Sequence, residues 1–220
     1  MNRTFKNILY SILPLLSLLT ILLLWLIVSR TEGSLIPSPS ATWSRFINIM
    51  CNPIANATLP LHILISLKRV LLALAAAMVV GITLGVLFGW NPVFRGLVMP
   101  AFEIIRPIPP IAWLPLVIIW CGIGELAKSV IVFIGAFTVI VINTQAGVKS
   151  IDQDLMRAGR SLGASHMQLL IHVAMPASFS AIFAGVKTAL STGWTCVLAA
   201  EMIAAKQGVG FLIIRGQEIG

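Results

Sequence analysis

Long apolar runs separated by short polar segments dominate this chain. The five longest runs with at most one charge cover residues 8–28, 70–94, 107–124, 129–148 and 173–200. A helix needs about 20 such residues to cross the hydrocarbon core of a bilayer, whereas barrel strands would alternate over about ten. The pattern therefore predicts an all-α polytopic membrane protein with five spans.

Composition agrees with this class. Hydrophobic residues make up 58% of the 220 residues and charged residues only 10%, whereas about a quarter of the residues in soluble domains are charged. The first run is longer than the roughly 7–15 apolar residues of a secretory signal core, so we interpret it as a retained helix. The three cysteines are widely spaced, which predicts neither a disulfide framework nor a metal site.

The net charge of +8 leaves two interpretations open. The lysines and arginines are scattered at the ends of the apolar runs and form no stripe, so we expect no nucleic-acid partner. They fit either the headgroups of membrane lipid or an anionic solute. The positive-inside rule does not decide the orientation, but the long polar segment after the fourth run favours a cytoplasmic N-terminus.

That polar segment, residues 150–176, predicts two short amphipathic helices. Asp152 and Asp154 stand where a helix start favours negative charge, and Gly163 supplies a stop. Ser165 and Gln168 have capping-box spacing for a second helix, which we expect to end at Pro176. Apolar or small residues recur at helical spacing at Leu155, Ala158, Gly159, Leu162, Met167, Leu170, Ile171 and Ala174. On this pattern alone, a hairpin resting on lipid remains an alternative.

A longer pattern in the same segment resembles a known loop. Three residues separate Arg157-Ala158-Gly159 from Gly163, and nine more separate Gly163 from Val173-Ala174-Met175-Pro176. This spacing resembles the EAA loop of permease subunits of binding-protein-dependent ABC importers, Glu-Ala-Ala, three residues, Gly, nine residues, Ile-x-Leu-Pro. In that family the helix pair docks into the ATP-binding subunit and transmits its closure to the spans. Arg157 replaces the usual Glu and Gly159 the second Ala, so the resemblance implies the docking but no ion pair made by that Glu.

Residues 103–116, 120–125 and 193–211 are similar to the taurine, sulfonate and nitrate importers, most of all to the taurine type. The resemblance extends over about residues 61–220 and implies a type I ABC importer permease in the bacterial inner (plasma) membrane. It implies a second permease copy as a homodimer, two ATP-binding subunits that use ATP and Mg²⁺, and a periplasmic or lipid-anchored solute-binding protein. This chain would be no enzyme and would bind no cofactor. Its expected cargo is a small anion, taurine or another alkanesulfonate.

The same resemblance suggests a division of the chain. Residues 1–60 would hold an N-terminal transmembrane helix and an external loop, and residues 61–220 the permease core with its coupling loop at 150–176. Members of the family continue with one more span. We therefore expect that span to be missing here, either because the protein is shorter or because the sequence is part of a longer one.

Prolines crowd the segment 106–116, RPIPPIAWLPL. Pro107, Pro109, Pro110 and Pro115 would each remove a backbone donor from a helix, at about 3 kcal/mol or more, and carbonyls left facing lipid cost still more. We therefore expect a broken or kinked segment shielded from lipid, either beside the translocation pathway or as a packing kink. Arg106 at its head would guide an anion or anchor the span to phosphate headgroups.

Three other features have alternative interpretations. The ridge Gly81-x-x-x-Gly85-x-x-x-Gly89 predicts close helix packing. Glu201 is either a pathway residue or an interfacial charge paired with Lys206. The tryptophans Trp113 and Trp194 would face either the pathway or the bilayer interface.

Other classes of protein fit the sequence less well. It contains no His-Glu-x-x-His, no Gly-x-Ser-x-Gly and no phosphate-binding Gly-x-x-x-x-Gly-Lys-Ser/Thr. Energy for transport would therefore come from another subunit. A secondary transporter or channel for a small anion is the alternative, although a transporter built from repeats would show a second broken segment.

Overall fold

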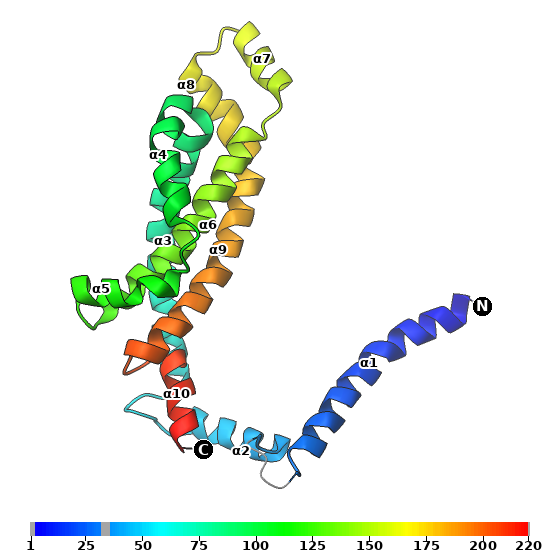
Figure 1. The fold of residues 1–220 in the computed structure, drawn as a ribbon. Helices are drawn as coiled ribbons and strands as arrows, with labels where there is room; N and C mark the ends of the chain where they lie inside the picture. The colour runs from blue at the N-terminus through cyan, green and yellow to red at the C-terminus, as the bar shows by residue number, and fades with distance from the viewer. Residues whose placement is uncertain (1–2, 32–35, 220) are drawn as a thin grey trace. The chain divides into compact units, whose positions relative to one another are not determined.

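The computed structural model describes residues 3–31 and 36–219 (Figure 1). Its elements within these ranges are helical: α1 Arg3–Val28, α2 Pro39–Cys51, α3 Leu59–Trp90, α4 Pro92–Ile105, η1 Pro110–Trp113, α5 Leu114–Cys121, α6 Glu125–Lys149, α7 Gln153–Ser161, α8 His166–Leu169, η2 Leu170–Ala174, α9 Met175–Ala204 and α10 Val209–Ile219. The all-α fold predicted from the sequence is confirmed. The chain divides into two compact units, residues 1–59 and 60–220, each described below by itself.

The first unit contains α1 and α2. Leucine and isoleucine side chains cover α1 from Ile12 to Val28 and are exposed all round, as expected for a helix that meets lipid. Helix α2 begins after Ser38, whose hydroxyl accepts the backbone N–H of Ala41 and caps the helix.

The second unit contains the other apolar helices. Leu59–Trp90, Glu125–Lys149 and His166–Ile203 are each long and apolar enough to cross a membrane. A fourth span exists if Pro92–Ile105 and Pro110–Cys121, which meet at 86°, are counted together. With the apolar helix Ile12–Val28 of the first unit, this inventory is compatible with the predicted number of spans.

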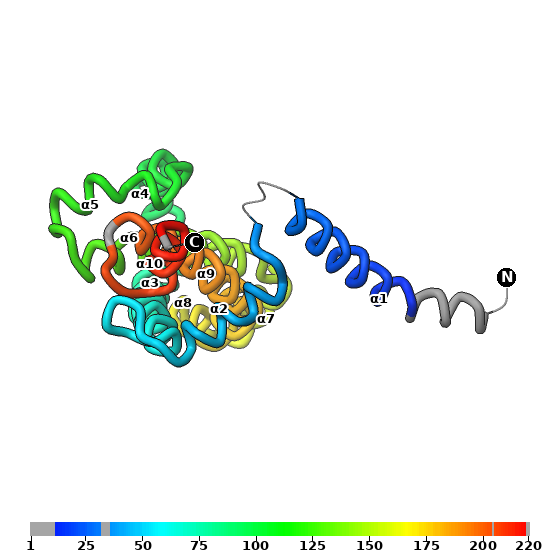
Figure 2. Tube along the Cα trace, turned by 90° about the horizontal axis from the view of Figure 1, so that it is seen from below, coloured from blue at the N-terminus to red at the C-terminus, as the bar shows by residue number. Residues whose placement is uncertain are grey.

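Helix α6 packs between α3 and α9 through glycines, and Figure 2 shows these three helices gathered in one bundle. On the α3 side, a Cβ added to Gly85 or Gly89 would lie 2.6 Å from Thr144 Cβ or Val148 Cβ. On the α9 side, Gly147 meets Ala181 in the same way, at 2.7 Å. The predicted packing role of the α3 ridge is confirmed, because only glycine lets the two backbones approach this closely.

One predicted span boundary is wrong. The uncharged run 70–94 is divided between α3 and α4, because the Asn91 side chain accepts the N–H groups of Val93 and Phe94 and Pro92 opens a new helix. Hydropathy detects the lack of charge but not this start signal. The run 107–124 is broken, as its prolines predict. It comprises a turn, the short 3₁₀-helix η1 and the eight-residue α5.

The expectation that Pro176 ends a helix is also wrong. Helix α8 continues through the π-helical turn η2 into α9, and the whole stretch His166–Ile203 forms one apolar helix of 38 residues. In the wider turn the Met175 N–H donates to the carbonyl of Leu170, five residues back. A π turn changes the local spacing where the Pro176 ring would otherwise meet the preceding carbonyl, so the helix accommodates the proline.

Candidate functional site

Residues 60–220 carry polar or exposed features at both ends of the bundle. The α7–α8 pair lies at the end where α3 and α6 finish, and a polar network lies where α3 and α6 begin and α9 finishes (Figure 1). The proline-rich break separates α4 from η1 and α5.

Helix α7 and its partner are set by caps that the sequence predicts correctly. Asp152 caps α7 by accepting the Asp154 N–H, and Gly163 follows α7 with a φ of +81°, a conformation that favours glycine. Ser165 and Gln168 exchange both bonds of a capping box at the start of α8. The glycine-joined helix pair is therefore confirmed up to its second helix, which runs on into α9.

Apolar residues of this pair form two groups. Met156 and Leu169 are buried, and Gly159 lets the helices meet, since a Cβ there would lie 2.5 Å from Leu169 Cδ2. Another group is exposed: Leu155 50%, Leu162 88%, Met167 61% and Ile171 53%. We call these four residues the apolar tip. The predicted periodicity thus selected mostly exposed positions, and such a patch on a surface hairpin is typical of an interaction site.

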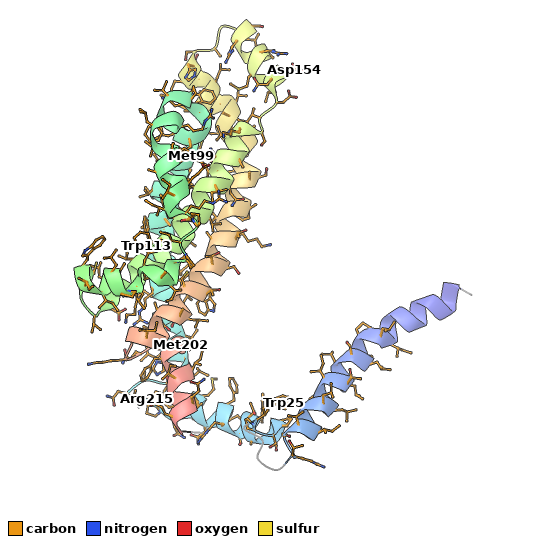
Figure 3. The ribbon with its side chains drawn as sticks, in the orientation of Figure 1. Trp25, Met99, Trp113, Asp154, Met202 and Arg215 are labelled. Carbon is orange, nitrogen blue, oxygen red and sulfur yellow. The ribbon has the colours of Figure 1, made fainter. Side chains whose placement is uncertain are left out.

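The remaining residues of the loop pattern lie around the apolar tip. Arg157 and Ala158 are exposed, and the Arg157 guanidinium pairs at 3.0 Å with Asp154, which Figure 3 labels on α7. Both charges are well solvated, so this pair contributes about 1 kcal/mol at most. Val173 and Met175 are half-buried and Pro176 is exposed.

Helix α8 is also tied to the bundle. Trp90, at the end of α3, donates its indole Nε1–H to His166 Nδ1 at 3.0 Å, and the two rings are tilted by 54° with their centroids 4.6 Å apart. Beside this contact lies a cavity of about 240 Å³ whose lining includes Lys149 and Arg160. The α7–α8 pair is therefore attached to α3 through Trp90 and to α9 through the continuous helix.

The predicted helix break occupies residues 106–109. Arg106 caps the end of α4, Pro107 and Pro109 lie exposed in the turn, Pro110 opens η1, and Pro115 lies in the first turn of α5. Pro115 therefore starts a helix and does not break one. The guanidinium of Arg106 is exposed and has no hydrogen bond or ion pair within the described residues.

The predicted pathway tryptophans pack against the same apolar cluster. Trp113 of η1 and Trp194 of α9 both pack against one apolar cluster that includes Val70, Ile131 and Val197. Trp113 Nε1 is buried and has no hydrogen-bond partner within the described residues, a donor left unsatisfied at an expected cost of about 1–3 kcal/mol.

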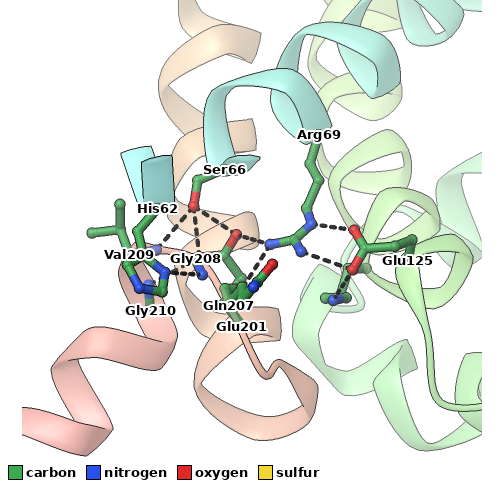
Figure 4. A network of polar contacts seen from close by, with 10 residues as sticks. His62, Ser66, Arg69, Glu125, Glu201, Gln207, Gly208, Val209 and Gly210 are labelled. Carbon is green, nitrogen blue, oxygen red and sulfur yellow. Dashed lines mark hydrogen bonds and ion pairs between the residues drawn. The ribbon is translucent and has the colours of Figure 1, made fainter. Parts of the chain in front are cut away.

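Glu201 is the centre of the polar network (Figure 4). Its carboxylate is fully buried and accepts Ser66 Oγ at 2.7 and 2.8 Å, Arg69 Nη1 at 2.5 Å and the Gly210 N–H at 2.9 Å. Of the two interpretations left open, the pairing with Lys206 is wrong, because the cation at Glu201 is Arg69 of α3. Lys206 is exposed.

The loop that leads into α10 closes over this carboxylate. The Gly208 N–H donates to His62 Nδ1 at 2.9 Å, and the Val209 N–H donates to Ser66 Oγ at 3.0 Å. Gly208 has a φ of +128° and allows no side chain, because an added Cβ would meet the Glu201 carboxylate. The turn is therefore built around the buried charge.

Arg69 also binds a second carboxylate. Its Nε and Nη2 both donate to Glu125, the first residue of α6, the latter at 2.7 Å, and Lys128 Nζ donates to the same carboxylate at 2.5 Å. The Arg69 and Lys128 side chains are 7% and 4% exposed, but Glu125 is 66% exposed. The network thus joins two buried cations with one buried and one exposed carboxylate.

Sequence reasoning found only Glu201 in this network. The signal for the others was present, since Arg69, Glu125 and Lys128 are charges at the ends of apolar runs of the sequence, where ionisable groups pair with one another. The partners of Arg69 lie 56 to 138 residues away in the chain, so no local pattern connects them to it, whereas Glu125 and Lys128 are three residues apart.

Comparison with known proteins identifies the family of this chain. Residues 77–220 match the family described as the binding-protein-dependent transport system inner membrane component. The chain belongs to this family. The resemblance predicted from the sequence is confirmed, and the protein is a multi-pass membrane permease component, not an enzyme.

Several relatives of this permease are named for the solute of their transport system. The taurine transport system permease protein of Escherichia coli K12 is 43% identical over 158 residues, 72% of this chain and 58% of that protein. A nitrate import permease of Synechocystis is 33% identical over 205 residues, 91% of this chain and 74% of the relative. A bicarbonate transport system permease of Synechococcus elongatus is 31% identical over 210 residues, covering 92% and 76%. The chain thus spans little more than half the length of the taurine permease.

Proposed function

We propose that this permease is the membrane subunit of an ATP-driven importer for a small oxyanion, with taurine or another alkanesulfonate as the first candidate. The observation that supports it most is the α7–α8 pair, which presents the apolar tip and continues without interruption into a 38-residue helix of the bundle. A surface patch fixed to a spanning helix is what coupling to a separate motor requires.

The partner at the apolar tip would be an ATP-binding subunit, present in two copies, that uses ATP and Mg²⁺. Burying one leucine-sized side chain contributes about 1.5–3 kcal/mol, and Leu162 and Met167 are the most exposed members of the tip. Part of that gain is lost to ordering the two partners. Arg157 would lie at the rim of the contact, where its charge affects association more than affinity.

This docking sets the orientation. The α7–α8 pair and the N-terminus would lie in the cytoplasm of a bacterial cell, and the Arg69–Glu201 network would lie at the outer end of the bundle in the inner membrane. A periplasmic or lipid-anchored solute-binding protein would approach that outer end. A second permease copy would complete the pathway.

Oxyanions as cargo are supported by two observations. The relatives are named for taurine, nitrate and bicarbonate, which all present at least two equivalent oxygens on one atom. Arg106 offers an exposed side chain whose guanidinium has no partner within the described residues. Arginine binds oxygen pairs through a planar fork. Glu201, by contrast, is engaged on all sides and would hold the network in place.

Transport by the reconstituted assembly tests this function. Permease, ATP-binding subunit and binding protein are placed in proteoliposomes, and uptake of labelled taurine is measured with competing alkanesulfonates, nitrate and bicarbonate. Uptake that requires ATP and is inhibited by one of these oxyanions supports the proposal. Uptake by the permease alone under a proton gradient would instead establish secondary transport, and failure of every oxyanion to compete would refute the substrate class.

A further inference from the structure

The two carboxylates of the polar network are held in different ways. Glu201 is fully buried and receives two neutral donors, Ser66 Oγ and the Gly210 N–H, in addition to Arg69. Glu125 is 66% exposed, and within the described part of the chain its carboxylate is bound only by the two cations, Arg69 and Lys128. One carboxylate is thus built into the fold, and the other occupies an anion position open to solvent.

The cations that hold Glu125 depend on an anion in that position. Arg69 and Lys128 are 6% and 3% exposed, and Glu201 supplies one negative charge for the two of them. Without Glu125 the cluster would keep an excess positive charge in a buried setting, which is costly. Any replacement for the Glu125 carboxylate must therefore be an anion.

The backbone before Glu125 allows its side chain to leave. Glu125 is the first residue of α6 and follows Gly122, with a φ of +76°, and Gly124, which is extended. No atom lies within 4 Å of the position where either glycine would carry a Cβ, so space surrounds this turn. Displacement of the carboxylate needs no movement of the buried residues.

The structure points to an exchangeable oxyanion site: we propose that Arg69 and Lys128 bind a small oxyanion in the place that the Glu125 carboxylate occupies. Arg69 presents Nε–H and Nη2–H side by side, one to each oxygen of the Glu125 carboxylate. Lys128 Nζ adds a third donor, on the oxygen that Nη2 binds. A sulfonate, nitrate or bicarbonate offers the same pair of oxygens on one atom, which suits a bidentate guanidinium. Exchange of one anion for the other keeps the cluster neutral.

The choice of anion class rests on the proposed function, but the site itself does not. A purely structural role for Glu125 makes a different prediction, namely that its removal destabilises the protein whatever anion is present. The two roles are separated by chemical rescue, in which an added anion takes the place of a deleted side chain.

The test uses Glu125→Ala in the purified 220-residue chain in lipid nanodiscs. Its thermal unfolding midpoint is followed while sodium nitrate or sodium methanesulfonate replaces sodium chloride at constant ionic strength. We expect both oxyanions to raise the midpoint saturably above that in chloride, because ligand bound to the folded state stabilises it. The matched control is Glu218→Ala, which removes an exposed carboxylate paired with Arg215 at 2.6 Å outside the network.

Rescue in Glu125→Ala that is absent from Glu218→Ala supports the site. If replacing chloride by oxyanion shifts the unfolding midpoint equally in the two variants, the proposed site is refuted. If Glu125→Ala yields no folded protein, Glu125→Gln is measured in its place, since the amide keeps the side chain but gives up the competing charge. Its apparent affinity for nitrate should be about tenfold higher than that of the wild type, and unchanged affinity would also refute the exchange.

Failure of the proposed function has a separate signature. Saturable rescue of Glu125→Ala in a protein whose complex imports no oxyanion would leave the site intact and refute the transport proposal. An importer of oxyanions whose Glu125 variants show neither rescue nor altered affinity would do the reverse.

Discussion

Close packing between α3 and α6 depends on Gly85, and substitution by alanine tests it. The added Cβ would lie 2.6 Å from Thr144 Cβ, 2.9 Å from Thr144 Cγ2 and 2.8 Å from the carbonyl oxygen of Val141. Carbon atoms in contact normally lie about 3.5–4.0 Å apart, so the methyl group arrives roughly 1 Å too close. Because the nearest atoms include backbone and a β-branched residue, the helices must separate.

Overpacking of this kind costs about 1–3 kcal/mol. Alanine also favours a helix over glycine by up to about 1 kcal/mol, which partly offsets the loss. Gly96→Ala in α4 is the matched control, because no atom lies within 4 Å of its added Cβ and only the propensity gain remains. The difference between the two variants isolates the packing cost.

Unfolding in mixed micelles, titrated with sodium dodecyl sulfate and followed by tryptophan fluorescence, measures both free energies of unfolding. We expect Gly85→Ala to be less stable than Gly96→Ala by about 1–3 kcal/mol. Equal stability of the two variants would refute the close approach of α3 and α6, and with it the structural role of the glycine ridge.

Four further predictions concern the functional regions. Arg106→Ala should strongly reduce uptake per assembled complex and Arg106→Lys only modestly, since lysine keeps the charge but loses the fork; full activity of the alanine variant would remove this residue from the pathway. Gly163→Pro should leave the spans inserted but uncouple transport from ATP hydrolysis, because proline cannot adopt a φ of +81°; normal coupled uptake would contradict the docking role. In a background without native cysteines, Ser165→Cys should react with an impermeant maleimide only from the cytoplasm and Lys206→Cys only from outside; the opposite labelling would reverse the orientation. Glu201→Gln should lower the free energy of unfolding by about 3–5 kcal/mol, as expected when a buried ion pair loses one partner, and thermal or detergent unfolding at wild-type stability would show that the network carries no such load.

Much of the helix content followed from the absence of charge, because a bilayer leaves few alternatives to a helix. The caps at Asp152, Gly163 and Ser165 were also predictable, since each acts on a backbone group within a few residues. These are local effects. A single sequence displays them directly.

The errors arose where distant parts of the chain decide. Pro176 was expected to end a helix, but a five-residue π turn accommodates it, and that outcome depends on the packing of α8 and α9. Arg69, Glu125 and Glu201 form a cluster only after three helices have been placed side by side. Glu201 was noticed because it is rare in an apolar run, but its partner could not be assigned by proximity in sequence.

The unbroken helix His166–Ile203 places both regions of interest on one mechanical element. At about 1.5 Å per residue, its 38 residues reach roughly 57 Å, from the apolar tip to two residues beyond Glu201. A tilt imposed on Met167 by a partner would therefore be transmitted to Glu201 along one continuous helix, through the π turn at residues 170–174. A change in the rigidity of that turn would change how much of a movement at one end of the helix is transmitted to the other end.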